Sequence, residues 1–385
     1  MVLPNFPESA REKREPTLDD TNRTITSNKN IFIFVFLVLC VTAASFNYFE
    51  KLWILKSSSS GSSSGIIYGS AINNNGYINQ RDTTFQNTPM CNSSGECGED
   101  PHIPSPRTVY SAKTKKQYEM WWEAHAKLKR SATEYAERRR NSNSNTTNSD
   151  SKPAMILIGD SITEEWLGTS MGKYHEPWKD IPQIMQDLFV PRYDPLVLAI
   201  GGDQTQHLLW RLQHGELLDG IVQDDSLFIM LIGTNNIGSG SLPEPTARGV
   251  IAVAEYILQR FDTGRLLLLQ LLPRGDNQRL KNICPPQCQD DGTTPLESFM
   301  PYVRKVNDIT KGEVQKLQTI HGQERIDLVD CGSLFVKEND LEGTGSVNMQ
   351  TVHVKKNLMP DFLHPNAKGQ RLLAQCILDC IDGSC

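Results

Sequence analysis

The sequence predicts an α/β fold, a three-layer α/β/α domain around a parallel five-stranded sheet. Five short apolar runs alternate with stretches of helical periodicity, and each run is apolar throughout rather than at every second residue. Continuous apolar strands separated by helices are typical of parallel sheets that are covered on both faces. With 38% hydrophobic and 22% charged residues, the composition suits a packed core over most of the chain.

The elements follow one another in the order that such a sheet requires. A first helix is expected over residues 114–140, where residues recur at helical spacing: Tyr118, Trp121, Trp122, His125 and Leu128. The strands are expected at Ala154–Ile158, Leu196–Ile200, Leu227–Ile232, Arg265–Leu272 and Ile326–Val329. Four more helices are expected at Thr205–Leu217, Thr246–Phe261, Glu297–Leu317 and Asn366–Ile381. In such folds ligands bind beyond the carboxyl ends of the strands.

The beginning of the chain is interpreted as a membrane anchor behind a polar tail. Residues 1–30 are polar and charged and are expected to be a disordered cytosolic tail. Residues 31–55 start with an uncharged apolar run, shorter than the ~20 apolar residues of an ordinary span, and are interpreted as a transmembrane signal anchor. Positive charges before the run predict a single-pass type II protein of the secretory pathway, with its larger part lumenal or extracellular. The alternative is a secreted protein whose signal peptide is cleaved near Val41-Thr42-Ala43.

The segment after the anchor reads as a spacer. Residues 56–113 are rich in Ser, Gly and Asn and are expected to form a flexible stalk, which leaves 114–385 as the folded domain with its leading helix. Sequons at Asn92 and Asn145 are expected glycosylation sites on the far side of the anchor.

Charge and cysteine content narrow the class of protein further. The net charge of −6 argues against a nucleic-acid partner, because phosphate binding needs a basic face. Eight of the nine cysteines follow the apolar run, which fits disulfides in an oxidising lumen. The spacing from Cys284 to Cys288 suits a small loop disulfide better than a zinc site.

The first expected strand ends in Gly159-Asp160-Ser161. A serine at the turn from a buried strand into a helix lies where a nucleophile belongs, with its hydroxyl in the crevice beyond the strands. Serine is also a common helix cap, so the motif alone is weak evidence.

Two further strand ends carry small or amide-bearing residues. The second expected strand runs into Gly201-Gly202-Asp203, and the third into Gly233-Thr234-Asn235-Asn236. A glycine N–H, an asparagine amide and the serine N–H together suit an oxyanion hole. Ordinary turn chemistry is the alternative for both motifs.

Near the end of the chain, Asp361-Phe362-Leu363-His364 precedes the last expected helix. A carboxylate three residues before a histidine on a loop can orient the imidazole, whose other nitrogen then faces the nucleophile. The order Ser161, Asp361, His364 completes a Ser–His–Asp arrangement. The four motifs together favour a catalytic site, because they occur in the order that this arrangement requires and three of them follow successive strands.

These blocks resemble those of the SGNH (GDSL-like) hydrolase superfamily, which is named for its Ser, Gly, Asn and His blocks. Within it, the chain is most similar to the catalytic subunits of type Ib platelet-activating-factor acetylhydrolase. The similarity extends beyond the four blocks and covers roughly residues 115–383. It includes residues 200–212 (IGGDQTQHLLWRL), 215–217 (GEL) and 271–275 (LLPRG), and Trp121 and His125 in the leading helix.

The resemblance implies a flavodoxin-like sheet and a role for each matched residue. Ser161 is the nucleophile, His364 the general base and Asp361 its orienting carboxylate. The oxyanion donors are the N–H groups of Ser161 and Gly202 and the side chain of Asn235. No metal or other cofactor is implied. Relatives of this subtype favour short acyl groups, acetyl above all, and the residues that flank the matched positions would shape an acyl pocket: Ile162, Thr234 and Leu363.

The predicted function is therefore that of a membrane-anchored serine esterase acting on short-chain esters of a lipid or a glycan. Residues 276–296 and 337–359 look enlarged relative to the family and lie where loops rim the crevice. The alternatives are an O-acetyltransferase on the same fold and a non-catalytic lumenal binding domain. The related subunits dimerise, but no feature of the sequence decides between a monomer and a homodimer. The compartment is left open between the Golgi, the endoplasmic reticulum and the cell surface.

Overall fold

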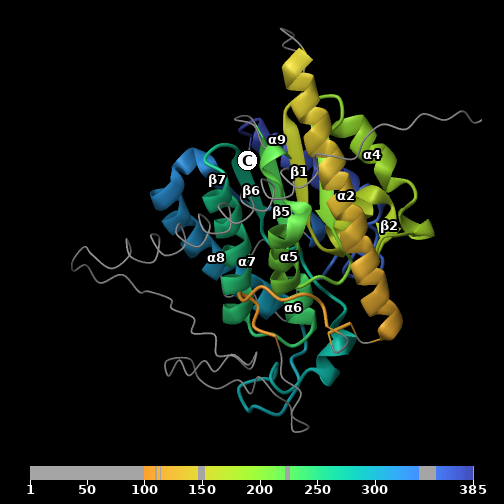
Figure 1. Cartoon of the computed structure of the whole chain (residues 1–385). Helices are drawn as coiled ribbons and strands as arrows, with labels where there is room; N and C mark the ends of the chain where they lie inside the picture. Colours follow the sequence, from red (N-terminus) through yellow and green to blue (C-terminus); the bar gives the residue numbers. More distant parts are fainter. Residues whose placement is uncertain are drawn as a thin grey trace, which may run out of the picture. The chain divides into compact units, whose positions relative to one another are not determined.

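Five parallel strands form the central sheet of the computed structural model (Figure 1). They are β1 (Ala154–Gly159), β4 (Asp194–Ala199), β5 (Leu227–Leu231), β6 (Arg265–Leu269) and β7 (Ile326–Val329). Their spatial order is β4-β1-β5-β6-β7. It is that of a flavodoxin-like doubly wound sheet, in which the direction of winding reverses between β1 and β5. The predicted parallel sheet is confirmed, and a crevice is expected between the ends of β1 and β5.

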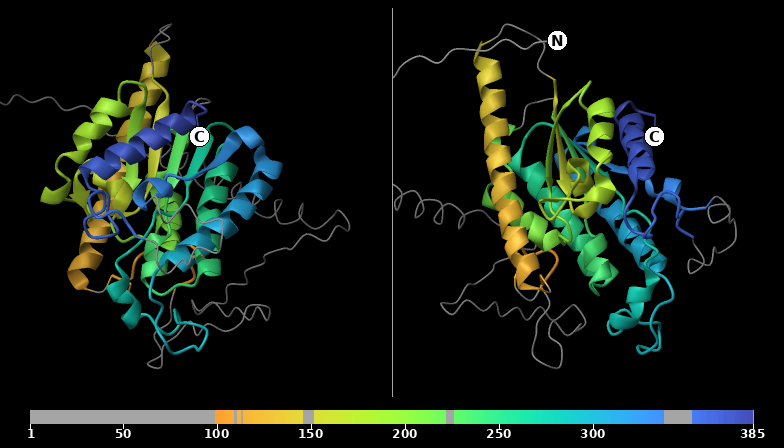
Figure 2. Two further views of the ribbon diagram at one scale, coloured as in Figure 1. Left: turned by 180° about the vertical axis from the view of Figure 1, so that it is seen from behind. Right: turned by 90° about the vertical axis from the view of Figure 1, so that its right-hand side faces the viewer.

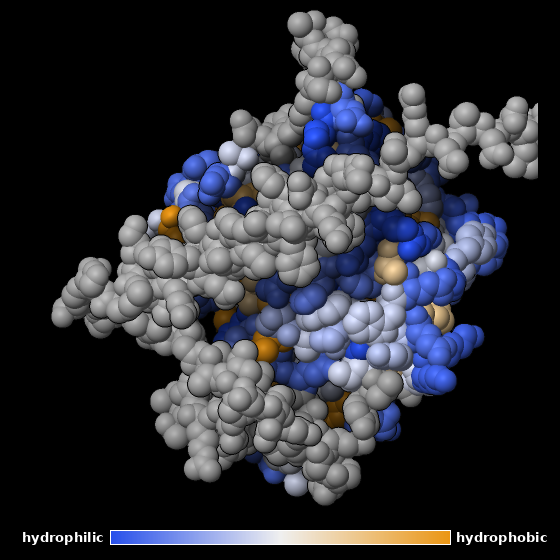
Figure 3. Space-filling view, in the orientation of Figure 1, coloured by the Kyte–Doolittle hydropathy of each residue, from blue (hydrophilic) through white to orange (hydrophobic). Residues whose placement is uncertain are grey.

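The structure describes residues 99–108, 111–112, 114–145, 152–221, 226–337 and 353–384, all of which belong to one compact unit, Thr84–Cys385. The expected tail, anchor and most of the stalk, with Asn92, lie outside these residues. Within the described ranges, no helix combines the length and the apolar character that a membrane span needs. Most of the described surface seen in Figure 3 is hydrophilic.

Helices cover both faces of the sheet (Figure 2). One face packs against α2 (Lys115–Asn145), α5 (Thr205–Arg211) and α7 (Pro243–Arg260). The other packs against α4 (Ile181–Leu188) and α9 (Ala367–Ile381), while α8 (Met300–His321) contributes to both apolar clusters. Side chains alternate along each strand, so Ile156 and Ile158 of β1 face α2 whereas Met155 and Leu157 face α9. The sheet is therefore buried on both faces, as the continuous apolar runs predict.

Two expected elements end earlier than the sequence pattern indicates. The fourth strand stops at Leu269, because the N–H and C=O of Leu271 bond to the side chain of Asn307 (2.8 and 3.1 Å) and not to a neighbouring strand. Helix α5 stops at Arg211 and continues as the π-helical turn η3 (Leu212–Glu216). Within this turn, His214 and Gly215 have non-helical backbone angles, with a φ of +102° at Gly215, so a regular helix does not run on to Leu217.

Several elements were not expected from the sequence. They are α4, the short helices α3 (Ser161–Glu164) and α6 (Thr234–Gly238), and a hairpin of β2 (Thr169–Ser170) and β3 (Lys173–Tyr174). Each of them except α4 is too short for a periodic signal.

Residues 99–108, named the strap here, pack against the start of α5. The Thr205 hydroxyl donates to the Pro101 carbonyl (2.7 Å), and the Ser105 N–H donates to the Gln206 carbonyl (3.2 Å). The ring of His207 bonds to the Glu99 carboxylate (2.7 Å). The packed region therefore begins before residue 114, the expected start of the folded domain.

Disulfides fasten two of the loops. Cys284 pairs with Cys288 within the loop after β6, the small loop disulfide that the spacing suggests. Cys331, just beyond β7, pairs with Cys376 of α9 and ties the last helix to the sheet.

Candidate active site

The serine of the first motif lies directly beyond β1. Gly159 ends the strand, and a Cβ at this position would collide with the Leu231 carbonyl and the Thr163 side chain, so only glycine fits the turn. Asp160 caps α3 by accepting a hydrogen bond from the Ile162 N–H (3.1 Å). Ser161 is then the first residue of the helix, and its hydroxyl faces the loop before α9.

That loop brings His364 to the serine. The Ser161 Oγ and His364 Nε2 are 2.9 Å apart, and the His364 Nδ1 and Asp361 Oδ2 are 2.7 Å apart. The other carboxylate oxygen of Asp361 accepts the N–H groups of Leu363 (3.0 Å) and His364 (2.7 Å), so the loop is closed by its own carboxylate. Trp178, which the sequence did not single out, packs its ring 5.7 Å from that of His364.

The direction of the hydrogen bond between Asp361 and His364 follows from the ionisation of the carboxyl. Partial burial acts to raise the pKa of Asp361, but the hydrogen bonds and charge of His364 outweigh it and lower that pKa to about 2. An ionised carboxylate can only accept, so the Nδ1–H of His364 donates to Asp361. In its neutral form, the form that acts as a base, the imidazole has one N–H, which leaves Nε2 to accept the proton of the Ser161 hydroxyl.

The predicted oxyanion donors come from three strand ends. Gly202, beyond β4, has a φ of +79° and belongs to the glycine turn, the name used here for Gly201–Asp203. In the part of the chain that the structure describes, the N–H groups of Ser161 and Gly202 donate no hydrogen bond. Asn235 of α6 donates its side-chain amide to the Asp203 carbonyl (3.0 Å) and the Asp160 carboxylate (3.3 Å).

Buried charges surround the glycine turn. The Asp203 carboxylate accepts from the Trp121 indole N–H (2.6 Å) and from the Arg211 Nε (2.7 Å). Arg211 also pairs with Glu216, whose second oxygen bonds to His125 Nδ1 (2.7 Å). This charged network, Trp121–His125–Asp203–Arg211–Glu216, fixes α2 and α5 beside the turn. It explains why Trp121 and His125 occur at helical spacing on the buried face of α2.

Two further groups hold the glycine turn, and neither was expected from the sequence. The Glu164 carboxylate accepts the N–H of Gly201 (2.6 Å), and the Arg107 guanidinium donates to the carbonyl of Gly201 (3.2 Å). Glu164 lies three residues after Ser161, a nearness that offered a weak signal. Arg107 is a single arginine in a polar segment, and nothing local marks it.

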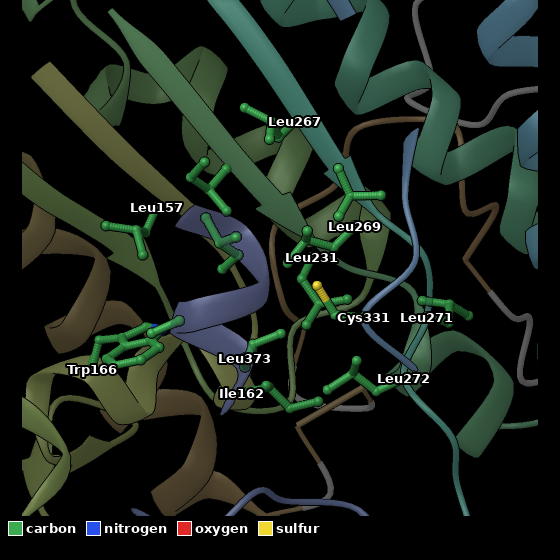
Figure 4. Packing of buried hydrophobic residues seen from close by; sticks show 14 of the residues in the cluster. Leu157, Ile162, Trp166, Leu231, Leu267, Leu269, Leu271, Leu272, Cys331 and Leu373 are labelled. Carbon is green, nitrogen blue, oxygen red and sulfur yellow. The ribbon is translucent and has the colours of Figure 1, made fainter. Parts of the chain in front are cut away.

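The three residues predicted to shape an acyl pocket have different surroundings. Ile162 is buried in the apolar core, where it lies with Leu373 of α9 (Figure 4). The carbonyl of Thr234 accepts from Arg274 (2.7 Å), and Leu363 is buried beside His364. Their role in acyl selection stays a prediction.

Of the expected glycosylation sites, Asn145 is the last residue of α2.

Burial shifts another acid beside the nucleophile. Asp160 is fully buried, and this raises its pKa to about 7, against smaller opposing effects of the Ile162 N–H and of His364. The group next to Ser161 is thus a carboxyl that the folded protein prefers to keep protonated in weakly acidic solution.

A hydroxyl, an imidazole and a carboxylate bonded in series beyond the ends of parallel strands define the class of serine hydrolases. The model of the GDSL-like Lipase/Acylhydrolase family matches residues 157–372, and the chain belongs to this family. The human platelet-activating factor acetylhydrolase IB subunit alpha1 is 34% identical over 128 residues, which is 33% of this chain and 47% of the relative. The human alpha2 subunit is 32% identical over 127 residues, with the same shares.

The chain therefore spans about half the length of the curated relatives that it matches. Among solved structures, a lipase/acylhydrolase from Enterococcus faecalis covers 60% of this chain, and 96% of that structure is matched, with a TM-score of 0.37 and 15% identity.

Proposed function

We propose that this chain is a serine esterase that hydrolyses short-chain esters, acetyl esters above all, of a lipid or a glycan. The observation that carries the proposal is the connected series from Ser161 Oγ to His364 Nε2 (2.9 Å) and from His364 Nδ1 to Asp361 (2.7 Å). Both separations are already within the reach that proton transfer and imidazole orientation require.

The reaction follows from the protonation of the pair. Ser161 Oγ attacks the carbonyl carbon of the ester while His364 Nε2 takes its proton. The tetrahedral intermediate then collapses, the ester C–O bond breaks, and the alcohol leaves with the proton from His364. A water molecule next gives a proton to His364 and attacks the acyl-serine. The bond from the acyl carbon to Ser161 Oγ then breaks, Oγ takes the proton from His364, and the carboxylic acid is released.

The negative charge that develops on the carbonyl oxygen needs donors that are already aimed at it. The N–H groups of Ser161 and Gly202 are proposed for two of the bonds. The Asn235 amide supplies the third, by giving up its longer contact to Asp160 (3.3 Å) while it keeps the one to the Asp203 carbonyl.

Acetyl esters are proposed because the relatives that match this chain are named acetylhydrolases. The buried side chains of Thr234 and Leu363 next to the site agree with a short acyl group. On the lumenal or extracellular face proposed below, such an enzyme would meet both acylated lipids and acylated glycans.

The chain is further proposed to be held in a membrane of the secretory pathway by residues 31–55, with the esterase domain lumenal or extracellular. The apolar run, the positive charges before it and the cysteines after it support this placement. Resistance of the full chain to carbonate extraction, with loss of sugar at Asn92 or Asn145 on glycosidase treatment, is the expected result. Recovery of a shortened, freely soluble chain from the medium would favour signal cleavage instead.

The esterase proposal is tested with the full chain on p-nitrophenyl esters of increasing acyl length. We expect cleavage of the acetate that falls steeply with longer chains, and a loss of about 10³-fold or more in Ser161→Ala. Ser131→Ala, ten residues after Trp121 on α2, is the matched control and should retain full activity. Wild-type activity in a folded Ser161→Ala variant would refute the proposal. Acyl transfer that depends on a sugar acceptor would point to the O-acetyltransferase. A chain that a serine-reactive fluorophosphonate does not label would point to a non-catalytic binding domain.

A further inference from the structure

Arg107 is a buried arginine at the candidate oxyanion hole that lies outside the residues matched by the family model. It belongs to the strap, only 8% of it is exposed, and its Nη1 donates to the carbonyl of Gly201 (3.2 Å). The strap is itself fixed on α5 through Pro101 and Ser105. Arg107 is therefore held in place by bonds that do not involve the catalytic triad.

The bond to Gly201 acts on the peptide unit that carries the predicted oxyanion donor. The C=O of Gly201 and the N–H of Gly202 are the two ends of one planar peptide group, and in a trans peptide they point in opposite directions. Fixing the carbonyl against Arg107 therefore also fixes the direction of the Gly202 N–H. On the preceding peptide unit, Glu164 accepts the N–H of Gly201 at 2.6 Å, so the turn is held from both sides.

The charge of Arg107 adds to its position. A cation that donates to a carbonyl polarises the peptide and makes the N–H at its other end a stronger donor. Another nitrogen of the guanidinium, Nη2, lies 2.9 Å from the place that a Cβ on Gly202 would occupy, so the group packs directly against that residue. Burial lowers the pKa of Arg107, and the charges of Asp203 and Glu99 oppose this effect and favour the ionised guanidinium.

From this geometry we propose that Arg107 is a positioning residue of the oxyanion hole, which aims and polarises the Gly202 N–H. The proposal rests on the esterase function proposed above. It also makes the strap part of the active site rather than of the stalk, because the strap brings this arginine to the glycine turn.

The test compares full-length Arg107→Met with the wild type on p-nitrophenyl acetate and on its thionoester, in which sulfur replaces the carbonyl oxygen. Sulfur accepts hydrogen bonds poorly, so the ratio of the two rates reports on the oxyanion hole rather than on the fold. We expect kcat for the oxygen ester to fall by about tenfold to a hundredfold, since one donor is misdirected but not removed, with KM little changed. The ratio of oxygen-ester to thionoester rates should fall as well.

Arg139→Met is the matched control. Arg139 is similarly buried on α2, but it bonds to the Lys152 carbonyl (3.1 Å) and to Asp194 (3.4 Å). Both partners lie at the amino ends of β1 and β4, opposite to the strand ends that carry the site. Arg139→Met should lose stability without a change in the rate ratio. Should Arg107→Met fail to fold, Arg107→Lys carries the same test, because it keeps a cation but loses the planar fork.

Three outcomes are distinguishable. A lower kcat with a lower rate ratio supports the proposal. An unchanged kcat, or a loss that is equal for both esters, would overturn it and leave Arg107 a purely structural residue. A folded wild-type chain that cleaves no ester would instead refute the proposed function.

Discussion

The triad and the glycine turn meet in one candidate site but are held by different interactions. Asp361 and His364 are three residues apart, bond directly to each other, and the Asp361 side chain is more than half exposed. The glycine turn is held by buried groups from distant parts of the chain, since Arg107 lies 94 residues before Gly201 and Trp121 lies 82 residues before Asp203.

The difference separates two kinds of dependence. The carboxylate and the imidazole of the triad lie on one local loop and can be altered chemically while the fold stays intact, because few buried contacts depend on them. A turn held by buried charges cannot be altered without a loss of stability, since removing one charge leaves its partners uncompensated inside the protein. Activity and unfolding free energy should therefore change independently at the triad and together in the charged network.

The largest expected loss of activity at the loop is in Asp361→Asn. The amide no longer fixes the Nδ1–H tautomer of His364, so the Nε2 position for accepting the Ser161 proton is lost. We expect kcat to fall by about 10³-fold, with the unfolding free energy unchanged to within about 1 kcal/mol. Ester hydrolysis and thermal unfolding measured on one preparation check this. A large loss of stability would show that the loop is not independent of the core.

The next largest effect is expected for Gly202→Ala in the glycine turn. The φ of +79° disfavours any residue with a side chain, and the new Cβ would meet the Arg107 guanidinium at 2.9 Å. A fall in kcat of about a hundredfold is expected, because the N–H at this position is displaced from the oxyanion. Gly312→Ala, at an open position of α8, is the control and should leave the rate alone.

A smaller change of rate, but a larger change of stability, is expected for Glu216→Gln. Glu216 pairs with Arg211 and His125 with its side chain fully buried, and the amide leaves Arg211 with the Asp203 carboxylate alone. We expect a loss of about 3 kcal/mol in unfolding free energy, measured by urea denaturation, and a fall in kcat of less than tenfold. Glu313→Gln removes an exposed pair with Lys316 and should cost less than about 1 kcal/mol. Equal losses in the two variants would contradict the buried network.

The sequence predicted the parts of this molecule that have a local signal. The sheet followed from uninterrupted apolar runs, and the fifth strand, Ile326–Val329, has the predicted bounds. The motifs around Ser161 and His364 are short and contiguous, and the structure places their side chains within hydrogen-bond distance. The prediction of a strand that runs past Leu269 was wrong, because the Asn307 side chain bonds to the backbone of Leu271. The prediction of a regular helix past Arg211 was also wrong, because Gly215 has a left-handed backbone conformation.

The rest depends on contacts between distant segments. Arg107 and Glu164 hold opposite sides of Gly201, yet neither belongs to a periodic pattern or a motif. The strap carries no apolar run, so its composition resembles that of the stalk before it. Only the folded chain shows that it bonds to α5 and reaches the glycine turn.

The smallest expected effect concerns pH and returns to the triad loop. The folded pKa of Asp361 is about 2, below its ordinary value of 3.8, so between these values the unfolded chain binds more protons than the folded one. Stability from this carboxylate is therefore complete above about pH 4 and is lost as pH falls through 2. Because the side chain is more than half exposed, the contribution is at most about 1 kcal/mol. Unfolding free energies of the wild type and of Asp361→Asn should converge below pH 2 and stay parallel above pH 4. A difference between the two free energies that widens towards acid would instead show that the stabilising charge lies outside this loop.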